Sequence, residues 1–399
     1  MAVKDSTDAF PLVFFQPVAD IHYNWTALML HVSPPAQGGS EFFTRLFNEF
    51  GLADALGHLS CILPVQDPDQ FDADFGVHLG PKQVIARVPV AHCIDAEKSA
   101  SFDRLHKQGL GLIVDGLPPH GAELNKHVSA MVLHCQSGTS SDAVSWLQKL
   151  RGAHIVEQVP DQLRLDVCSS AGFRWFSGDY ALHPSNTASQ RDAISHARLL
   201  KMLELVSRDA DAHEIELLLR QDPALSYQLF KLVSSAAFGY SSHVTSFNQA
   251  INLLGRRQLQ RWLQLLLYAR NPNDIAANPL LPRAAARAGL MEAMCKELGY
   301  DRDEQDRAFI VGMFSLLNIL LDMSLAEILQ PLTMPPDVVE ALLERSGRLG
   351  QLLDIVERSE YGGAPLRHED LERSGLDAES YCHCLMRAYR WAAQVSHDA

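Results

Sequence analysis

The chain has 399 residues and a formal net charge of −14, from 34 basic and 48 acidic residues, and 47% of its residues are hydrophobic. This length and hydrophobic content favour about two domains with full-sized cores and exclude a disordered protein. The acidic balance argues against a general nucleic-acid binder, because neutralising phosphates requires a basic surface.

The beginning of the chain, MAVKDSTDAFPLVFF, lacks the basic start and the long apolar core of a signal peptide. No apolar run elsewhere reaches the roughly 18 residues needed to cross a bilayer. The seven cysteines are an odd number and lie scattered along the chain, which is typical of reduced thiols. We therefore expect a cytoplasmic protein that does not enter a membrane.

Short apolar runs alternate with helix-like segments through residues 10–184. Repeated strand and helix units of this kind predict a mainly parallel sheet, and about eight of them predict a TIM-like barrel. The first two strands form an antiparallel hairpin in this prediction, because the segment HYN between them is too short for a crossover helix. The expected strands are 12–21, 25–32, 59–65, 84–90, 110–117, 130–135, 154–159 and 173–182, and the expected helices include 41–56, 96–108, 141–151 and 161–171.

A polar, turn-rich segment follows, and we place the domain linker at residues 185–195. From 196 to 394 the periodicity is helical almost throughout, which predicts an all-helical second domain. One helix begins clearly, with Asp222 as its N-cap and Pro223 at its first position. Further helices are expected at about 246–254, 256–269, 282–298, 304–321, 336–345, 348–358 and 378–393.

Candidate chemistry begins at Asp115, which ends the apolar strand GLGLIVD. Catalytic groups of a barrel gather at the carboxyl ends of its strands, and the corresponding positions on other strands include Arg87 and Glu157. Two carboxylates are a thin ligand set for a divalent cation, and Arg87 would put a fixed positive charge where the cation should bind. We therefore expect no metal here, and Asp115 is either solvated or paired with Arg87.

Other motifs for cofactor or nucleophile chemistry are missing from the sequence. The histidines show no zinc-binding spacing, and no glycine-rich nucleotide loop or serine-nucleophile motif is present. We interpret the segment CHC at 382–384 as ordinary helix residues. Two side chains that are two residues apart on a helix, such as Cys382 and Cys384, point in nearly opposite directions. We expect no cofactor.

Two segments of the helical half are candidates for recognition. GRRQLQRW begins a helix and sets arginines beside a tryptophan, which suits an acidic partner, although a solvated helix face explains the same pattern. An aromatic turn precedes it, and for this turn packing and binding stay open as alternatives. The residues of this candidate interaction surface are Phe238, Tyr240, Arg256, Arg257, Arg261 and Trp262.

The helical half resembles an HDOD domain, a non-hydrolytic relative of the HD phosphohydrolases. The resemblance rests on LLRQDPALSYQLFKLVSSAAFGYSSHVTSFNQAINLLGRRQLQRWL, residues 218–263. Phe314 and Ser315 stand near the place of the metal-binding His-Asp pair of the hydrolases. The resemblance implies a signalling or interaction module without phosphohydrolase activity.

The N-terminal half resembles an EAL domain, the barrel that hydrolyses cyclic di-GMP. FFQPVADI keeps Gln16 and Pro17 of the opening strand, and HIVEQV keeps Glu157. The other matched positions differ from the family. Thr26 stands for the metal-binding glutamate of the signature, Leu30 for a phosphate-binding arginine, Arg87 for a second glutamate, Gly116 for the second member of an Asp-Asp pair, and Ser177 for a glutamine. The resemblance therefore implies a degenerate barrel.

The order of the two domains resembles a family of two-domain bacterial signal transduction proteins. It implies a regulator or scaffold that is not an enzyme and acts through protein–protein interaction. The implied partners are other signalling proteins, and a homodimer is a further alternative. Leu30 argues against cyclic di-GMP as a ligand, because an arginine on the phosphate is expected there. The alternative is a catalytically inactive cyclic di-GMP receptor.

Overall fold

The computed structural model describes residues 10–35, 39–71, 84–183, 278–332, 334–360 and 365–398, with single residues at 201, 204–205, 214, 261, 264–265 and 268. The chain divides into two compact units. The first contains residues up to Ser185 together with Glu357–Arg390, and the second contains Asn186–Val356 together with Trp391–Ala399.

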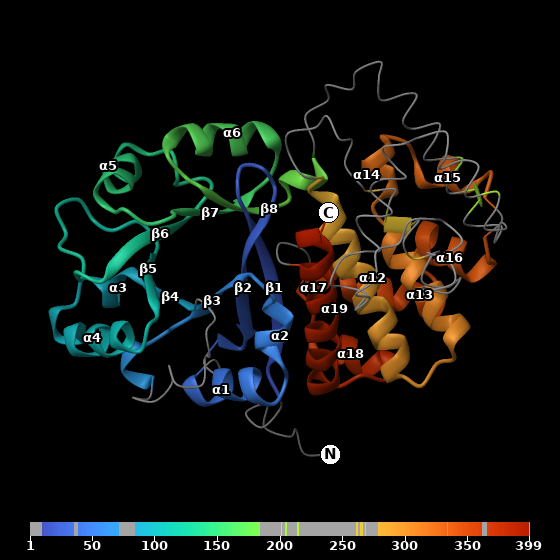
Figure 1. Ribbon diagram of the computed structural model, residues 1–399, viewed down its shortest axis with the longest axis horizontal. Coiled ribbons are helices and arrows are strands. Elements are labelled where there is room, and N and C mark those ends of the chain that lie inside the picture. Colours follow the sequence, from blue (N-terminus) through green and yellow to red (C-terminus); the bar gives the residue numbers. More distant parts are fainter. Residues whose placement is uncertain are drawn as a thin grey trace, which may run out of the picture. The chain divides into compact units, whose positions relative to one another are not determined.

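Eight strands of the first unit close into a barrel in chain order (Figure 1). β1 is antiparallel to both of its neighbours, β2 and β8, and the other neighbouring pairs are parallel. The predicted TIM-like barrel and its opening hairpin are therefore confirmed. The strands are β1 (Leu12–Ala19), β2 (Trp25–Ser33), β3 (Ser60–Pro64), β4 (Val84–Pro89), β5 (Gly111–Asp115), β6 (Val128–His134), β7 (Ile155–Val159) and β8 (Trp175–Gly178).

Local sequence features set the limits of the helices between the strands. The expected helix 41–56 is two helices, because Gly51 between them has a left-handed φ of 75° that interrupts the helix. The side chain of Ser140 caps the next-to-last helix of the barrel segment by accepting from the Ala143 N–H. The helices are α1 (Ser40–Asn48), α2 (Leu52–Leu56), α3 (Val90–Cys93), α4 (Ser99–Lys107), α5 (Ser141–Lys149) and α6 (Gln162–Ala171), and the 3-10 turns are η2 (Pro68–Gln70), η4 (Ala96–Lys98) and η5 (Tyr180–Leu182).

The interior of the barrel holds a layer of buried apolar side chains. Its members come from seven of the strands and are Val18, Ala27, Met29, Ile62, Ile85, Ile113, Ala130, Val132 and Ile155. Side chains alternate between the two faces of a strand, so the residue two positions after an interior residue also points inward. Two positions after Ile85, Ile113 and Ile155 stand Arg87, Asp115 and Glu157. The strands therefore carry these three side chains to the carboxyl ends of the barrel.

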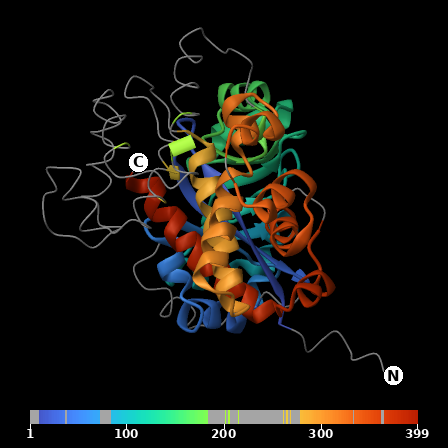
Figure 2. The same cartoon turned by 90° about the vertical axis from the view of Figure 1, so that its right-hand side faces the viewer.

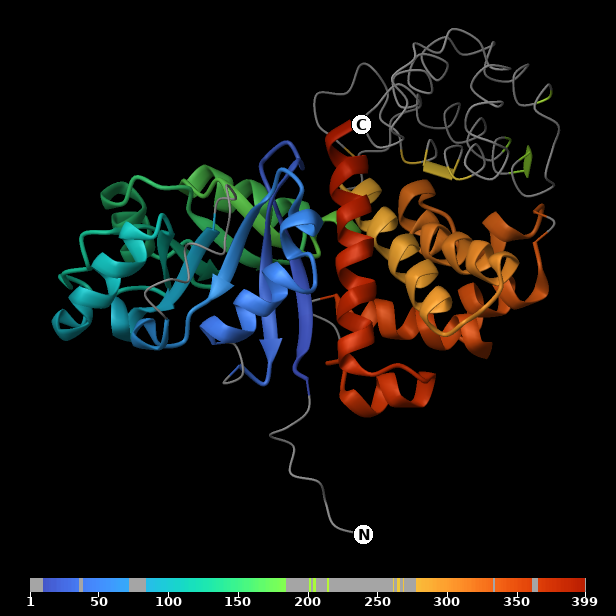
Figure 3. The ribbon, with the colours of Figure 1, turned by 60° about the horizontal axis from the view of Figure 1, so that its bottom comes forward.

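A segment from the end of the chain covers the outer faces of β1 and β2 (Figures 1 and 3). It contains α18 (His368–Ser374) and the first part of α19 (Ala378–Asp398). The Tyr389 ring lies 4.9 Å from the Phe15 ring and 6.0 Å from the Trp25 ring, centroid to centroid. The predicted boundary of 196–394 groups this segment with the helical domain instead. The predicted linker lies outside the described residues.

The second unit is helical where it is described, as predicted. Figure 2 shows α12, coloured yellow to orange, as a long helix. α12 and α13 approach closely, because a Cβ at Gly312 would lie only 2.6 Å from the Ala288 backbone. The expected helix 304–321 is broken after Phe314, where the Ser315 hydroxyl donates to the Gly312 carbonyl at 2.7 Å. The helices are α12 (Leu280–Glu297), α13 (Arg302–Phe314), α14 (Leu317–Leu321), α15 (Leu325–Leu329), α16 (Pro336–Glu344) and α17 (Gly347–Ser359).

Two expectations for the helical half concern residues outside the described ranges. They are the helix that begins at Asp222 and the expected helix 246–254. Among the described helices, none combines the length and the hydrophobicity that a membrane crossing requires.

Candidate functional site

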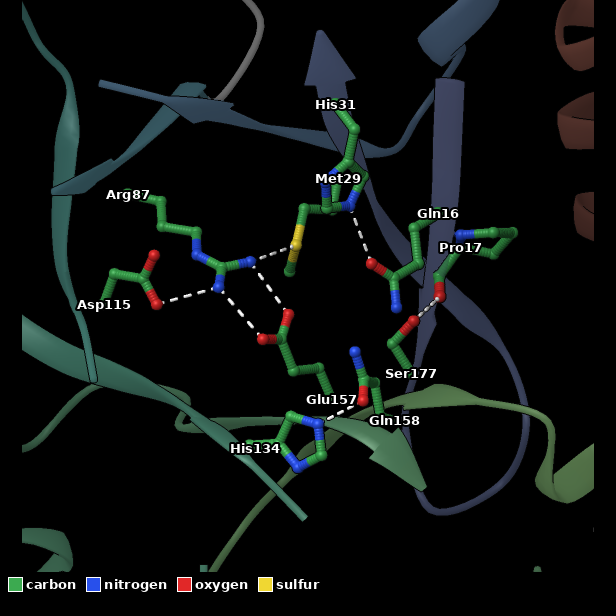
Figure 4. A network of polar contacts seen from close by, with 10 residues as sticks. All are labelled: Gln16, Pro17, Met29, His31, Arg87, Asp115, His134, Glu157, Gln158 and Ser177. Carbon is green, nitrogen blue, oxygen red and sulfur yellow. Dashed lines mark hydrogen bonds and ion pairs between the residues drawn. The ribbon is translucent and has the colours of Figure 1, made fainter. Parts of the chain in front are cut away.

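Arg87 lies between two carboxylates at the carboxyl ends of the strands (Figure 4). Its Nη1 donates to Glu157 Oε2 at 2.9 Å, and its Nη2 donates to Glu157 Oε1 at 3.0 Å and to Asp115 Oδ1 at 2.8 Å. Nη1 also donates to Met29 Sδ at 2.9 Å. We call Arg87, Asp115, Glu157 and Met29 the strand-end cluster.

Burial makes the two carboxylates of the cluster unequal. The side chains of Arg87 and Glu157 are 13% and 10% exposed, whereas that of Asp115 is 39% exposed. Desolvation lowers the pKa of Arg87, but hydrogen bonds and charges from Asp115 and Glu157 outweigh it and raise the pKa above its ordinary value. The guanidinium is therefore a permanent charge that Glu157 holds from inside and Asp115 from the solvent side.

One polar atom of the cluster has no partner among the described residues. Arg87 Nε is buried and makes no hydrogen bond within this part of the chain. A buried donor without a partner costs about 1–3 kcal/mol. Arg87 therefore has one hydrogen-bonding position that the described side chains leave open.

A second polar pair lies beside the cluster on β1 and β2. The His31 Nε2 donates to Gln16 Oε1 at 2.7 Å, with the ring proton on Nε2 because the amide oxygen can only accept. Burial first, and the Arg87 charge second, lower the pKa of His31 to about 3. His31 is therefore neutral at physiological pH.

The structure brings together four of the predicted site residues. Arg87, Asp115 and Glu157 form the cluster, and Gln16 lies beside it on β1 (Figure 4). The expected pairing of Asp115 with Arg87 is present. Gly116 directly follows β5 and has a φ of 101°, a left-handed conformation that favours glycine.

Thr26 and Leu30 do not join the cluster, which corrects their predicted place. The Thr26 hydroxyl donates to the Val18 carbonyl at 3.1 Å. Leu30 pairs with Phe15 in the β1–β2 register, and the Phe15 ring contacts Tyr389 on the outside of the barrel. Cross-strand partners share a face, so Leu30 points outward and is fully buried there.

Met29 and His31 are the residues of β2 that sequence reasoning missed. They alternate with Leu30 and share the inner face with Ala27. A polar residue inside an apolar strand, HVS after ALML, was the available signal. Further polar contacts nearby join His134 to Gln158, and the Ser177 hydroxyl to the Pro17 carbonyl at 2.7 Å (Figure 4).

The donor set of the cluster does not fit a divalent cation. A metal would need the oxygens of Asp115 and Glu157, which the Arg87 guanidinium occupies. Within the described part of the chain, no three histidine, cysteine, aspartate or glutamate side chains are grouped as metal ligands would be.

Arg261 has a structural place, which corrects its assignment to an interaction surface. Its Nη2 donates to Glu292 Oε1 at 2.5 Å and to Asp306 Oδ1 at 3.1 Å, and its guanidinium lies 4.6 Å from the centre of the Phe309 ring. The side chain is 17% exposed. It joins α12 to α13. The other predicted surface residues, Phe238, Tyr240, Arg256, Arg257 and Trp262, lie outside the described residues.

Comparison with known proteins supports the two-part organisation. Residues 195–341 match the HDOD domain family. The cyclic di-GMP phosphodiesterase CdgJ of Vibrio cholerae is 28% identical over 253 residues, which are 62% of this chain and 57% of CdgJ. The uncharacterised protein YuxH of Bacillus subtilis is 26% identical over 246 residues, 59% of either chain. The chain thus spans less than two thirds of the length of either relative.

Solved structures similar to part of the chain include EAL domains. The EAL domain of Mycobacterium smegmatis DcpA is 14% identical, with a TM-score of 0.34, and covers 42% of this chain and 90% of that one. The EAL domain of Xanthomonas citri FimX, solved in complex with cyclic di-GMP, is 14% identical with a TM-score of 0.34 and covers 43% and 86%. Similarity at this level says nothing about the ligand or activity of this chain.

Two predictions from the sequence are wrong against these relatives. The name of CdgJ contradicts the expectation that this chain is not an enzyme, and it contradicts the expectation against cyclic di-GMP. Both expectations rested on individual replaced residues, and one of them, Leu30, does not face the interior. The chain has a closed, TIM-like barrel of eight strands, and residues 195–341 match the HDOD domain family.

Proposed function

We propose that this protein is a cyclic di-GMP signalling protein whose strand-end cluster binds the dinucleotide through Arg87. The observation that carries the proposal is the unequal pairing of this arginine, with a buried Glu157 on one side and a half-exposed Asp115 on the other. Similarity to CdgJ, a cyclic di-GMP phosphodiesterase, supplies the identity of the ligand.

Binding would exchange one anionic partner of Arg87 for another. A guanidinium binds phosphate oxygens as well as it binds a carboxylate, often through two parallel bonds. Glu157 contributes both of its oxygens and is 10% exposed, so it stays. Asp115 contributes one oxygen from the solvent side and is the partner that a phosphodiester can replace.

Calorimetric titration with cyclic di-GMP tests this exchange. Asp115→Asn removes the competing charge, and we expect the dissociation constant to fall about fivefold to tenfold. Arg87→Lys keeps the charge but loses the fork geometry, and we expect binding at least tenfold weaker. Asp142→Asn, an exposed acid on α5, is the matched control and leaves the affinity unchanged. Absence of heat for both the wild type and Asp115→Asn at tens of micromolar protein would retire the proposal.

Hydrolysis is measured on the same samples, by chromatography of the products after incubation with magnesium or manganese. If the wild type hydrolyses cyclic di-GMP and Arg87→Lys does not, this chain would be a cyclic di-GMP phosphodiesterase, as CdgJ is named. Dinucleotide that binds and survives would instead support the predicted degenerate barrel, which stays a prediction.

The HDOD match supports a second part of the proposal, that the protein is a regulator or scaffold that passes its signal on through protein–protein interaction. Capture of partners from a lysate by the wild type, and by a chain with Arg256 and Trp262 replaced by alanine, tests the predicted contact surface. Identical partner sets would show that the surface lies elsewhere. The seven cysteines, buried and without disulfides, support the proposed cytoplasmic location.

A further inference from the structure

Tyr389 of α19 contacts the two strands that carry Gln16 and His31. Its hydroxyl donates to the carbonyl of Phe15, the residue before Gln16, at 3.3 Å. Its ring packs on Phe15 and Trp25, which lie on the outer faces of β1 and β2. Tyr389 is 7% exposed, so this contact is a buried one.

The β1–β2 hairpin is paired with β3 on one side, through Ala27, Leu28 and Met29, but only thinly with β8 on the other side, where the barrel closes. β1 pairs with β8 through a single residue pair, Ala19 with Phe176, whereas it pairs with β2 along its whole length. The Ser177 hydroxyl adds one hydrogen bond to the Pro17 carbonyl. On the β8 side, the position of β1 therefore relies more on what packs against its outer face.

Other contacts anchor the same C-terminal segment to the barrel unit. The His383 ring stacks on Phe50 at 4.4 Å, and the His368 Nε2 donates to the Phe10 carbonyl at 2.9 Å. Arg390 pairs with Asp54 at 3.5 Å. The segment that holds the hairpin is thus separated from the last barrel strand by more than 170 residues of sequence, most of them in the second unit.

We propose that Tyr389 is a positioning residue, through which α19 holds the β1–β2 hairpin so that Gln16 and His31 meet beside Arg87. Residues 357–390 then help to position the side chains of the strand-end site. Residues 186–356, which belong to the second unit, separate this segment from the rest of the barrel unit in sequence. Because α19 contacts both strands of the hairpin, we expect a change that shifts α19 to shift this site too.

The test compares Tyr389→Ala with Tyr389→Phe in the full chain. The control is Tyr300→Ala, a half-buried tyrosine of the second unit. NMR titration of the His31 ring is the first measurement. In Tyr389→Ala, we expect His31 to titrate at least one pH unit higher than in the wild type, because the ring becomes hydrated. Tyr389→Phe keeps the ring contacts and stays close to the wild type, as does the control.

Hydrogen exchange along residues 12–19 and 25–33 is the second measurement, and we expect it to rise at least tenfold in Tyr389→Ala alone. If Tyr389→Ala does not fold, Tyr389→Leu keeps an apolar cover and takes its place. A folded variant with unchanged His31 titration and unchanged exchange would overturn the proposal.

The role in ligand binding rests on the proposed function, and one titration separates the two. We expect Tyr389→Ala to bind cyclic di-GMP at least fivefold more weakly than Tyr389→Phe. If no variant binds the dinucleotide while the His31 titration still moves, the proposed function fails and the positioning role stands.

Discussion

Arg87 and Glu157 meet fork to fork across the interior of the barrel, with both guanidinium Nη atoms within 3.0 Å of the two carboxylate oxygens. They come from β4 and β7, which are not neighbours in the sheet. The pair therefore ties opposite sides of the barrel together at its carboxyl end.

Removing Glu157 should cost far more stability than removing Asp115. Glu157→Gln leaves a buried guanidinium without its two-bond partner, and we expect a loss of about 3 kcal/mol in the free energy of unfolding. Asp115 is half-exposed, so Asp115→Asn should cost less than about 1 kcal/mol. Urea unfolding of the two variants measures the difference, and equal losses would show that the buried fork does not dominate.

His31 should make the protein less stable in mild acid. Its pKa is about 3 in the folded chain and 6.5 in the unfolded one, so the unfolded chain takes up a proton first as the pH falls. The contribution of neutral His31 to the free energy of unfolding is complete above pH 6.5 and is lost as the pH falls from 6.5 to 3. When the pH falls from 7 to 5, we expect the free energy of unfolding to decrease by about 1–2 kcal/mol less in His31→Gln than in the wild type. Urea titrations at the two pH values measure this difference. Parallel losses would speak against a neutral buried ring.

Gly312→Ala should disrupt the packing of α12 on α13. A methyl group there would lie 2.6 Å from backbone atoms of Ala288, which cannot yield as a flexible side chain can. We expect a loss of about 2 kcal/mol or more, seen as a lower thermal midpoint. Gly39→Ala, where a Cβ meets nothing within 4 Å, is the control and should change the midpoint little.

Arg261→Ala should lower stability, because the side chain pairs with two acids and covers the Phe309 ring. We expect a loss of about 1–2 kcal/mol, since two partly exposed ion pairs and the cover of the Phe309 ring are lost together. Arg302→Ala, at the exposed start of α13, serves as the comparison. A loss of partner binding without any fall in the thermal midpoint would restore the surface role predicted from the sequence.

Much of the barrel follows from local sequence. The eight expected strands all appear, and each overlaps its predicted range. Short apolar runs without alternation predict strands that are buried on both faces. The interior positions follow from Ile85, Ile113 and Ile155, two residues before the charged side chains. The expected helix 304–321 was wrong at Ser315. There the Ser315 hydroxyl donates to the Gly312 carbonyl and competes with the backbone hydrogen bonds of the helix, and the sequence pattern does not show whether a serine makes this bond.

The sequence by itself determined the barrel, its opening hairpin, the HDOD segment, and the placing of Asp115 and Arg87 at neighbouring strand ends, with pairing as one of two alternatives for Asp115. These depend on the alternation of side chains and on strand ends that closure brings to one edge. Tertiary structure decided that Asp115 pairs with Arg87, that Leu30 points outward and His31 inward, that Arg261 pairs with Glu292 and Asp306, and that Tyr389 covers β1. Each of these depends on strand register or on contacts between residues far apart in the chain, which no local pattern encodes.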